Sequence, residues 1–101
     1  MPLASQISVP IDQIAEICRR YQVRELALFG SAVRDEMGPD SDVDVLVEFA
    51  PGAHVGLYKF GALSDELTAV FGRKVDLVTK SGLKPWVREH VLGEARVIHA
   101  A

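Results

Sequence analysis

The pattern of residues 43 to 49, VDVLVEF, constrains the fold of this chain more than any other feature. Apolar side chains stand at every second position from Val43 to Phe49, and Asp44 and Glu48 lie between them. A period of two is typical of a β-strand that turns one face to a hydrophobic core. Such a strand needs neighbours in a sheet and a covering layer, and Asp44 must lie on the face opposite the valines.

Helical and strand patterns alternate along the rest of the chain. Ile11, Ile14 and Cys18 repeat at helical spacing and predict a helix over 10–22. In the same way, Trp86 and Val91 belong to one apolar helical face, so we expect Trp86 to pack in the core or against a partner. The remaining predicted elements are a strand at 25–29, a helical turn or two after Ser31, a helix over 56–72, a strand at 74–79, a short helix over 83–91 and a last strand at 96–100. This order predicts an α/β (α+β) fold with a small mixed β-sheet flanked by helices.

Composition narrows the class of protein. The chain has 101 residues, 49% of them apolar and 25% charged, which is typical of one globular domain spanning 1–101. Its net charge of −3 disfavours direct binding to duplex nucleic acid. No apolar run is long enough for a membrane span or resembles a secretory leader. The single cysteine, Cys18, excludes an internal disulfide and favours a buried thiol in a cytoplasmic protein.

Three aspartates are the candidate catalytic and metal-binding residues. Asp42 and Asp44 are two residues apart and project from one face of their strand, whereas Asp76 interrupts the apolar strand at 74–79. If the two strands are neighbours in the sheet, all three carboxylates lie close together and repel one another. A hard divalent cation would relieve that repulsion, and two Mg²⁺ ions can clamp the attacking and leaving oxygens of a phosphoryl transfer.

Simpler interpretations of these residues exist. An EF-hand is excluded, because Val45 stands where its calcium loop needs glycine and Pro51 stands where it needs glutamate. The acids could instead decorate a solvated strand face. Gly30 and Ser31 could be no more than a strand end and a helix cap, although glycine also lets backbone approach a phosphate at a helix start.

The combination is more specific than its parts. Gly30-Ser31, ten intervening residues, Asp42-Val43-Asp44 and a later strand aspartate, Asp76, resemble the signature of the DNA polymerase β-like nucleotidyltransferase superfamily. Over nearly the whole chain the sequence is similar to the minimal nucleotidyltransferases, the MNT or MntA-like antitoxins. One departure is visible, because Asp35 stands where family members often carry glycine.

The resemblance implies a palm-type nucleotidyltransferase fold and an activity. Such proteins use Mg²⁺ to transfer AMP from ATP to a tyrosine of a small helical HEPN-type toxin, with which they form a hetero-oligomer. Asp42, Asp44 and Asp76 would hold two metal ions, and Asp76 would help to activate the acceptor hydroxyl. Gly30 and Ser31 would contact the phosphates.

Three alternatives remain open at this point. For Arg34 the two alternatives are an ion pair with a phosphate oxygen and a solvated position on a helix. As a whole, the chain could be a non-catalytic antitoxin that neutralises its partner by binding alone. A weaker alternative is a nucleotide sensor or a transferase acting on a small molecule.

Overall fold

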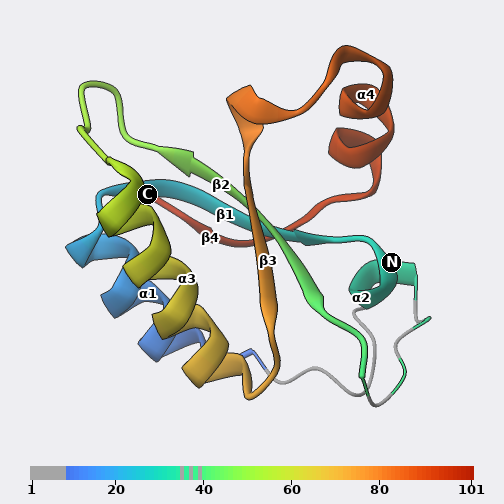
Figure 1. Ribbon diagram of the computed structural model, residues 1–101, viewed down its shortest axis with the longest axis horizontal. Helices are drawn as coiled ribbons and strands as arrows, with labels where there is room; N and C mark the ends of the chain where they lie inside the picture. Colours follow the sequence, from blue (N-terminus) through green and yellow to red (C-terminus); the bar gives the residue numbers. More distant parts are fainter. Residues whose placement is uncertain (1–8, 35, 37, 39) are drawn as a thin grey trace.

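In the computed structural model, the described residues are 9–34, 36, 38 and 40–101, and they form alternating helices and strands (Figure 1). The elements match the predicted order, and their ends differ from the predicted ones by at most three residues. They are α1 (Ile11–Arg20), β1 (Val23–Phe29), α2 (Ser31–Arg34), β2 (Val43–Phe49), α3 (Leu57–Phe71), β3 (Val75–Thr79), the 3-10 turn η1 (Lys80–Gly82), α4 (Pro85–Glu94) and β4 (Arg96–Ala100).

The strands form one mixed sheet in the order β3-β2-β1-β4. β1 runs antiparallel to both β2 and β4, whereas β2 and β3 are parallel and are connected through α3. A parallel pair requires such a crossover, because the chain must return to the same end of the sheet. The predicted small mixed sheet flanked by helices is therefore confirmed.

The main core lies between the sheet and the pair α1 and α3, which cover one face (Figure 1). Val43, Val45 and Val47 are all buried on this face, as their spacing predicts. The opposite face carries a smaller cluster in which Val91 of α4 packs on Ala27 and Leu46. Because Asp44 alternates with the buried valines, its side chain lies on this opposite face, the one on which α4 packs.

Helix α4 departs from its predicted role. Val91 is its only buried residue, and Trp86 is 77% exposed, with the Lys84 ammonium 5.5 Å from its ring centre. Trp86 therefore does not pack in the core of this chain, because α4 contacts the sheet mainly through Val91. Packing of Trp86 against a partner stays a prediction. His90, whose side chain is 72% exposed, likewise lies outside the core.

Two further expectations concern single segments. Cys18 is fully buried in α1, as predicted for a structural thiol. No helix within the described residues is long and apolar enough to cross a membrane.

Candidate active site

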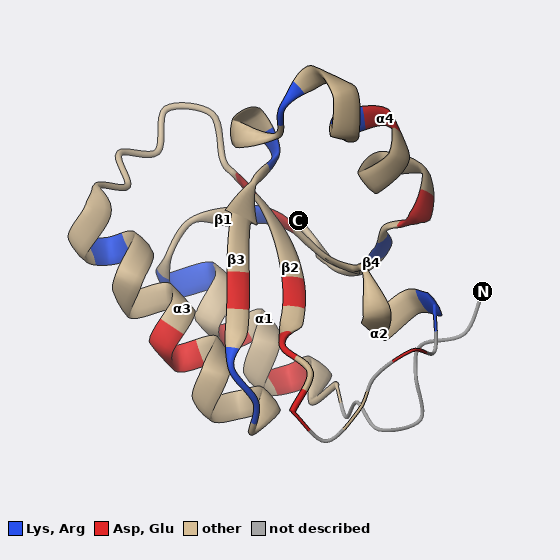
Figure 2. Ribbon diagram, turned by 45° about the vertical axis from the view of Figure 1, so that its right-hand side comes forward, with Lys and Arg blue, Asp and Glu red and all other residues tan. Residues whose placement is uncertain are grey.

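Asp44 and Asp76 are direct neighbours across two parallel strands. Their Cα atoms are register partners in the pairing of β2 with β3. Residues paired in this way point to the same face of the sheet, and neighbouring strands lie about 4.8 Å apart. The two acidic segments stand side by side on β2 and β3 in Figure 2. The sequence-based condition for a carboxylate cluster, that these strands be neighbours, is therefore met.

Asp42 lies one residue before β2 and is exposed. The backbone N–H of Val43 donates to the carbonyl of Lys74 at 2.9 Å, which ties the start of β2 to the start of β3. Asp42 and Asp44 thus flank a residue that is held in place by the neighbouring strand. Asp44 is half-buried, and Asp76 is exposed.

Antiparallel pairing brings the Gly30-Ser31 turn to the same place. Phe29, the last residue of β1, is the register partner of Asp44. Gly30 follows with a φ of +71°, and a β-carbon there would clash with Oδ2 of Asp44. Only glycine combines this left-handed backbone with such a close approach. Ser31 then begins α2, so the predicted phosphate-binding turn adjoins the aspartates.

The carboxylates of this site repel one another. Burial raises the pKa of Asp44 above its ordinary value, and the negative charges of Asp76 and Asp42 raise it further. The positive charge of Arg34 acts in the opposite direction. A divalent cation would remove this electrostatic penalty, and carboxylate oxygens are the donors that Mg²⁺ prefers.

The side chains do not form a closed metal site by themselves. Over the described parts of the chain, no three acidic, histidine or cysteine side chains converge in an arrangement that could hold an ion. Carboxylate oxygens are donors that suit Mg²⁺. The role of Asp42, Asp44 and Asp76 as Mg²⁺ ligands stays a prediction.

A fourth acid, Glu94, completes the surroundings of the turn, and sequence reasoning missed it. The Gly30 N–H donates to Oε2 of Glu94 at 2.6 Å, and Nη1 of Arg34 donates to Oε1 at 2.9 Å. Glu94 stands at the end of α4, far from the turn in sequence. No spacing rule connects the two positions, so only the tertiary fold brings them together.

Arg34 lies beside the site, with the Nε and Nη1 groups of its guanidinium hydrogen-bonded to two glutamates. Its Nε donates to Glu36 at 2.5 Å, and hydrogen bonds to Glu36 and Glu94 raise the pKa of the guanidinium. The side chain is 44% exposed. Asp35, the departure from the family pattern, lies outside the described residues.

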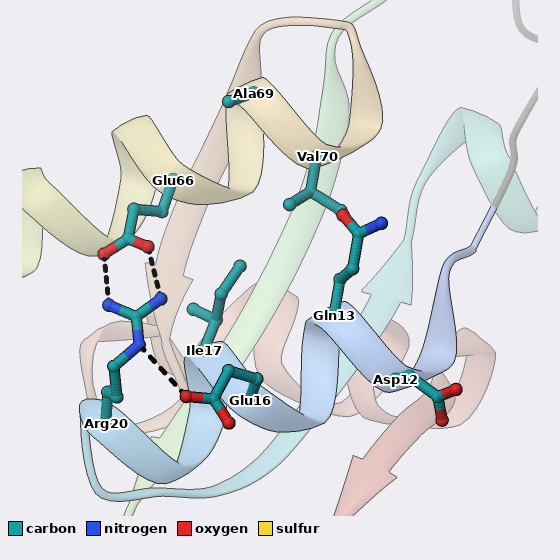
Figure 3. Close-up of a pocket in the computed structure, with 8 residues that line it drawn as sticks. All are labelled: Asp12, Gln13, Glu16, Ile17, Arg20, Glu66, Ala69 and Val70. Atoms are coloured by element: carbon teal, nitrogen blue, oxygen red, sulfur yellow. Dashed lines mark hydrogen bonds and ion pairs between the residues drawn. The ribbon is translucent and has the colours of Figure 1, made fainter.

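A separate groove of about 430 Å³ lies on the other side of the molecule, between α1 and α3 (Figure 3). Arg20 spans it and donates two hydrogen bonds to Glu66, at 3.0 and 2.5 Å. None of the six predicted site residues lines this groove. Arg20 pairs with two of its three carboxylates, Glu16 and Glu66, so the groove offers no comparable cluster of unpaired carboxylates.

Comparisons with known proteins find a matching family model, similar sequences and similar folds. A family model described as "Nucleotidyltransferase domain" matches residues 11–99. The protein adenylyltransferase MntA of Thermococcus cleftensis is 47% identical over 79 residues, which cover 78% of each chain. The residues matched by the family model include the Gly30-Ser31 turn and the three aspartates.

Solved structures share the fold. A minimal nucleotidyltransferase is 36% identical, with a TM-score of 0.72 and coverage of 85% of this chain and 86% of that one. A toxin–antitoxin structure with AMP-PNP has a TM-score of 0.74 at 18% identity, covering 92% and 75%. A complex of a tri-AMPylated Shewanella oneidensis HEPN toxin with its MNT antitoxin has a TM-score of 0.64 at 17% identity, covering 90% and 70%.

Proposed function

This chain belongs to the nucleotidyltransferase domain family, and on that premise we propose that it is an antitoxin that transfers AMP from ATP to a HEPN-type toxin. The acceptor in this proposal is a hydroxyl group, specifically that of a tyrosine. The observation that carries the proposal is the register pairing of Asp44 with Asp76 beside the Gly30 turn. Carboxylates and a backbone turn for phosphate are what a nucleotidyl transfer needs in one place.

One sequence relative and two structural neighbours support the chemistry and the partner. The MntA relative is named a protein adenylyltransferase, which supports AMP as the transferred group. The structural neighbour that contains a tri-AMPylated HEPN toxin and an MNT antitoxin supports a helical toxin as acceptor and a hetero-oligomer as the working assembly. The neighbour with AMP-PNP supports ATP as the donor.

The site residues take distinct roles in this proposal. Asp42, Asp44 and Asp76 would hold Mg²⁺, which when bound neutralises the carboxylates and the charge of the triphosphate. Gly30 and Ser31 would approach the β- and γ-phosphates through backbone and hydroxyl donors. Arg34 would pair with a phosphate oxygen.

The reaction is a single in-line displacement. The acceptor oxygen forms a bond to the α-phosphorus of ATP while the bond to the bridging oxygen breaks, and pyrophosphate leaves. The hydroxyl proton passes to Asp76 or to solvent water. No covalent bond to this chain forms, so positioning and charge neutralisation supply the rate enhancement.

The experiment combines the chain with the HEPN-type partner, ATP and Mg²⁺, and measures the intact mass of the partner. We expect the partner to gain the mass of one or more AMP groups, with tandem mass spectrometry locating them on tyrosine. Asp42→Asn, Asp44→Asn and Asp76→Asn should each abolish the gain, as should chelation of the metal. Asp65→Asn is the matched control, because Asp65 is an exposed acid of α3 on the other side of the sheet.

The same experiment separates the enzyme from a purely binding antitoxin. Inhibition of the toxin by the triple Asp→Asn variant, together with no mass gain from the wild type, would show that complex formation alone neutralises the partner. Loss of protection in the triple variant despite a stable complex would show that AMP transfer is required.

A further inference from the structure

Glu94 bridges two groups of the candidate phosphate site. Its Oε2 accepts the Gly30 N–H at 2.6 Å, and Nη1 of Arg34 donates to Oε1 at 2.9 Å and to Oε2 at 3.1 Å. The Glu94 side chain is only 16% exposed. His90 stands 3.3 Å from Oε1 and would add a charged contact when protonated. One carboxylate thus contacts the backbone of the turn and the only basic side chain of α2.

This arrangement is not explained by packing. Val91 alone is buried among the residues of α4, and it already attaches the helix to the sheet. Glu94 adds a negative charge near Asp44 and contributes to raising the pKa of that carboxyl. Extra negative charge beside repelling carboxylates is unfavourable unless the group is held by donors or performs a task. Here the two donors are the Gly30 N–H and Nη1 of Arg34, both of them groups of the candidate phosphate site.

We propose that Glu94 is a positioning residue of the nucleotidyl transfer reaction. By accepting the Gly30 N–H it fixes the orientation of the peptide between Phe29 and Gly30, just beyond the last residue of β1 that pairs with β2. By pairing with Nη1 it fixes the plane of the Arg34 guanidinium. Charge-assisted hydrogen bonds from Nη1 to both oxygens of Glu94 orient the arginine better than a solvated position does.

The pairing leaves one end of Arg34 available. Nε donates to Glu36 and Nη1 donates to Glu94, whereas Nη2 makes no hydrogen bond to the described part of the chain. Nη2 is therefore the donor that Arg34 offers to a phosphate oxygen of the nucleotide. In this proposal Arg34 binds a phosphate group of ATP, and that role rests on the proposed function.

The test compares Glu94→Ala and Glu94→Gln with the wild type. Binding of ATP with Mg²⁺ is measured by titration calorimetry, and AMP transfer to the partner gives kcat and KM for ATP. We expect Glu94→Ala to weaken ATP binding about tenfold or more, the size expected when one charge-assisted hydrogen bond is lost. Glu94→Gln should be intermediate, because an amide oxygen still accepts the Gly30 N–H but no longer neutralises Arg34.

The control variant is Glu89→Ala. Glu89 is an exposed acid of the same helix with no hydrogen bond or ion pair to the described residues, so it reports any general effect of removing a charge from α4. A second readout needs neither nucleotide nor partner. The Gly30 amide proton resonance should move upfield in Glu94→Ala, because a short bond to a carboxylate is lost, and should stay in place in Glu89→Ala.

Two results would overturn the positioning role. One is an ATP affinity of Glu94→Ala that equals that of Glu89→Ala. The other is tighter ATP binding by Glu94→Ala, which would show that the carboxylate competes with phosphate for the turn. If wild type binds ATP but transfers no AMP, the proposed function fails while the affinity and resonance comparisons still decide the role of Glu94.

Discussion

Gly30 and Asp44 are in such close contact that no other residue fits at position 30. A β-carbon at Gly30 would clash with Oδ2 of Asp44 and lie 3.1 Å from its carboxyl carbon, and the φ of Gly30 is +71°. Because Asp44 is also the register partner of Asp76, the turn and the acidic pair form one unit. The position of the Asp44 carboxylate therefore depends on the absence of a side chain at Gly30.

Gly30→Ala should strongly reduce AMP transfer. The added methyl group must displace the Asp44 carboxylate, and a shift of about 1 Å in a catalytic group can cost about 100-fold in rate. The measurement is AMP transfer to the HEPN-type partner by intact mass. Gly72→Ala is the matched control, since Gly72 has a φ of +70° and nothing within 4 Å of an added β-carbon. Equal activity of the two variants would contradict the role of the close contact.

Asp44→Asn should stabilise the metal-free protein at neutral pH. The pKa of Asp44 is raised in the folded state, so its ionised form is less favourable there than in the unfolded chain. The penalty appears as the pH rises above the ordinary value of 3.8 and is complete above the raised folded-state pKa. We expect a melting temperature a few degrees above wild type in chelator, with the difference shrinking toward acid pH. Mg²⁺ should stabilise wild type more than the variant, and an unchanged metal response would argue against Asp44 as a ligand.

Glu66→Gln should reveal the ion pair that joins α1 to α3. Hydrogen bonds from Arg20 and from the Tyr21 hydroxyl lower the pKa of Glu66 to about 2. Its contribution to stability is therefore complete above the ordinary value of 4.5 and is lost as the pH falls toward about 2. Denaturant unfolding should place the variant slightly below wild type at neutral pH, because the pair is largely exposed. A difference that stays constant down to acid pH would exclude this ion pair as the cause.

Cys18 should resist alkylation in the native protein. The thiol is fully buried, and burial raises its pKa to about 11, so little thiolate forms at neutral pH. Mass spectrometry after iodoacetamide treatment should show an unmodified native chain and one modification after unfolding in denaturant. Rapid and complete labelling of the native chain would mean that α1 opens readily or that the thiol is accessible.

Much of the fold could be predicted from periodicity. The alternation from Val43 to Phe49 predicted both the strand and its buried face, because a strand with one wet face leaves a period of two in its sequence. Helix α4 shows the limit of this reasoning. Its apolar residues repeat at helical spacing, yet Trp86 is exposed, because a helical period defines a face without stating whether another element covers it.

The sequence by itself determined the local chemistry of the candidate site. It specified a glycine turn, two acids on one strand face and a third acid in a later strand, since each of these depends only on residue type and near-neighbour spacing. The tertiary structure alone decided that β2 and β3 are parallel neighbours with Asp44 opposite Asp76, and that Glu94 contacts Gly30 and Arg34. Strand order and the docking of α4 follow from how the apolar faces of distant segments are buried together, and no local pattern records that outcome.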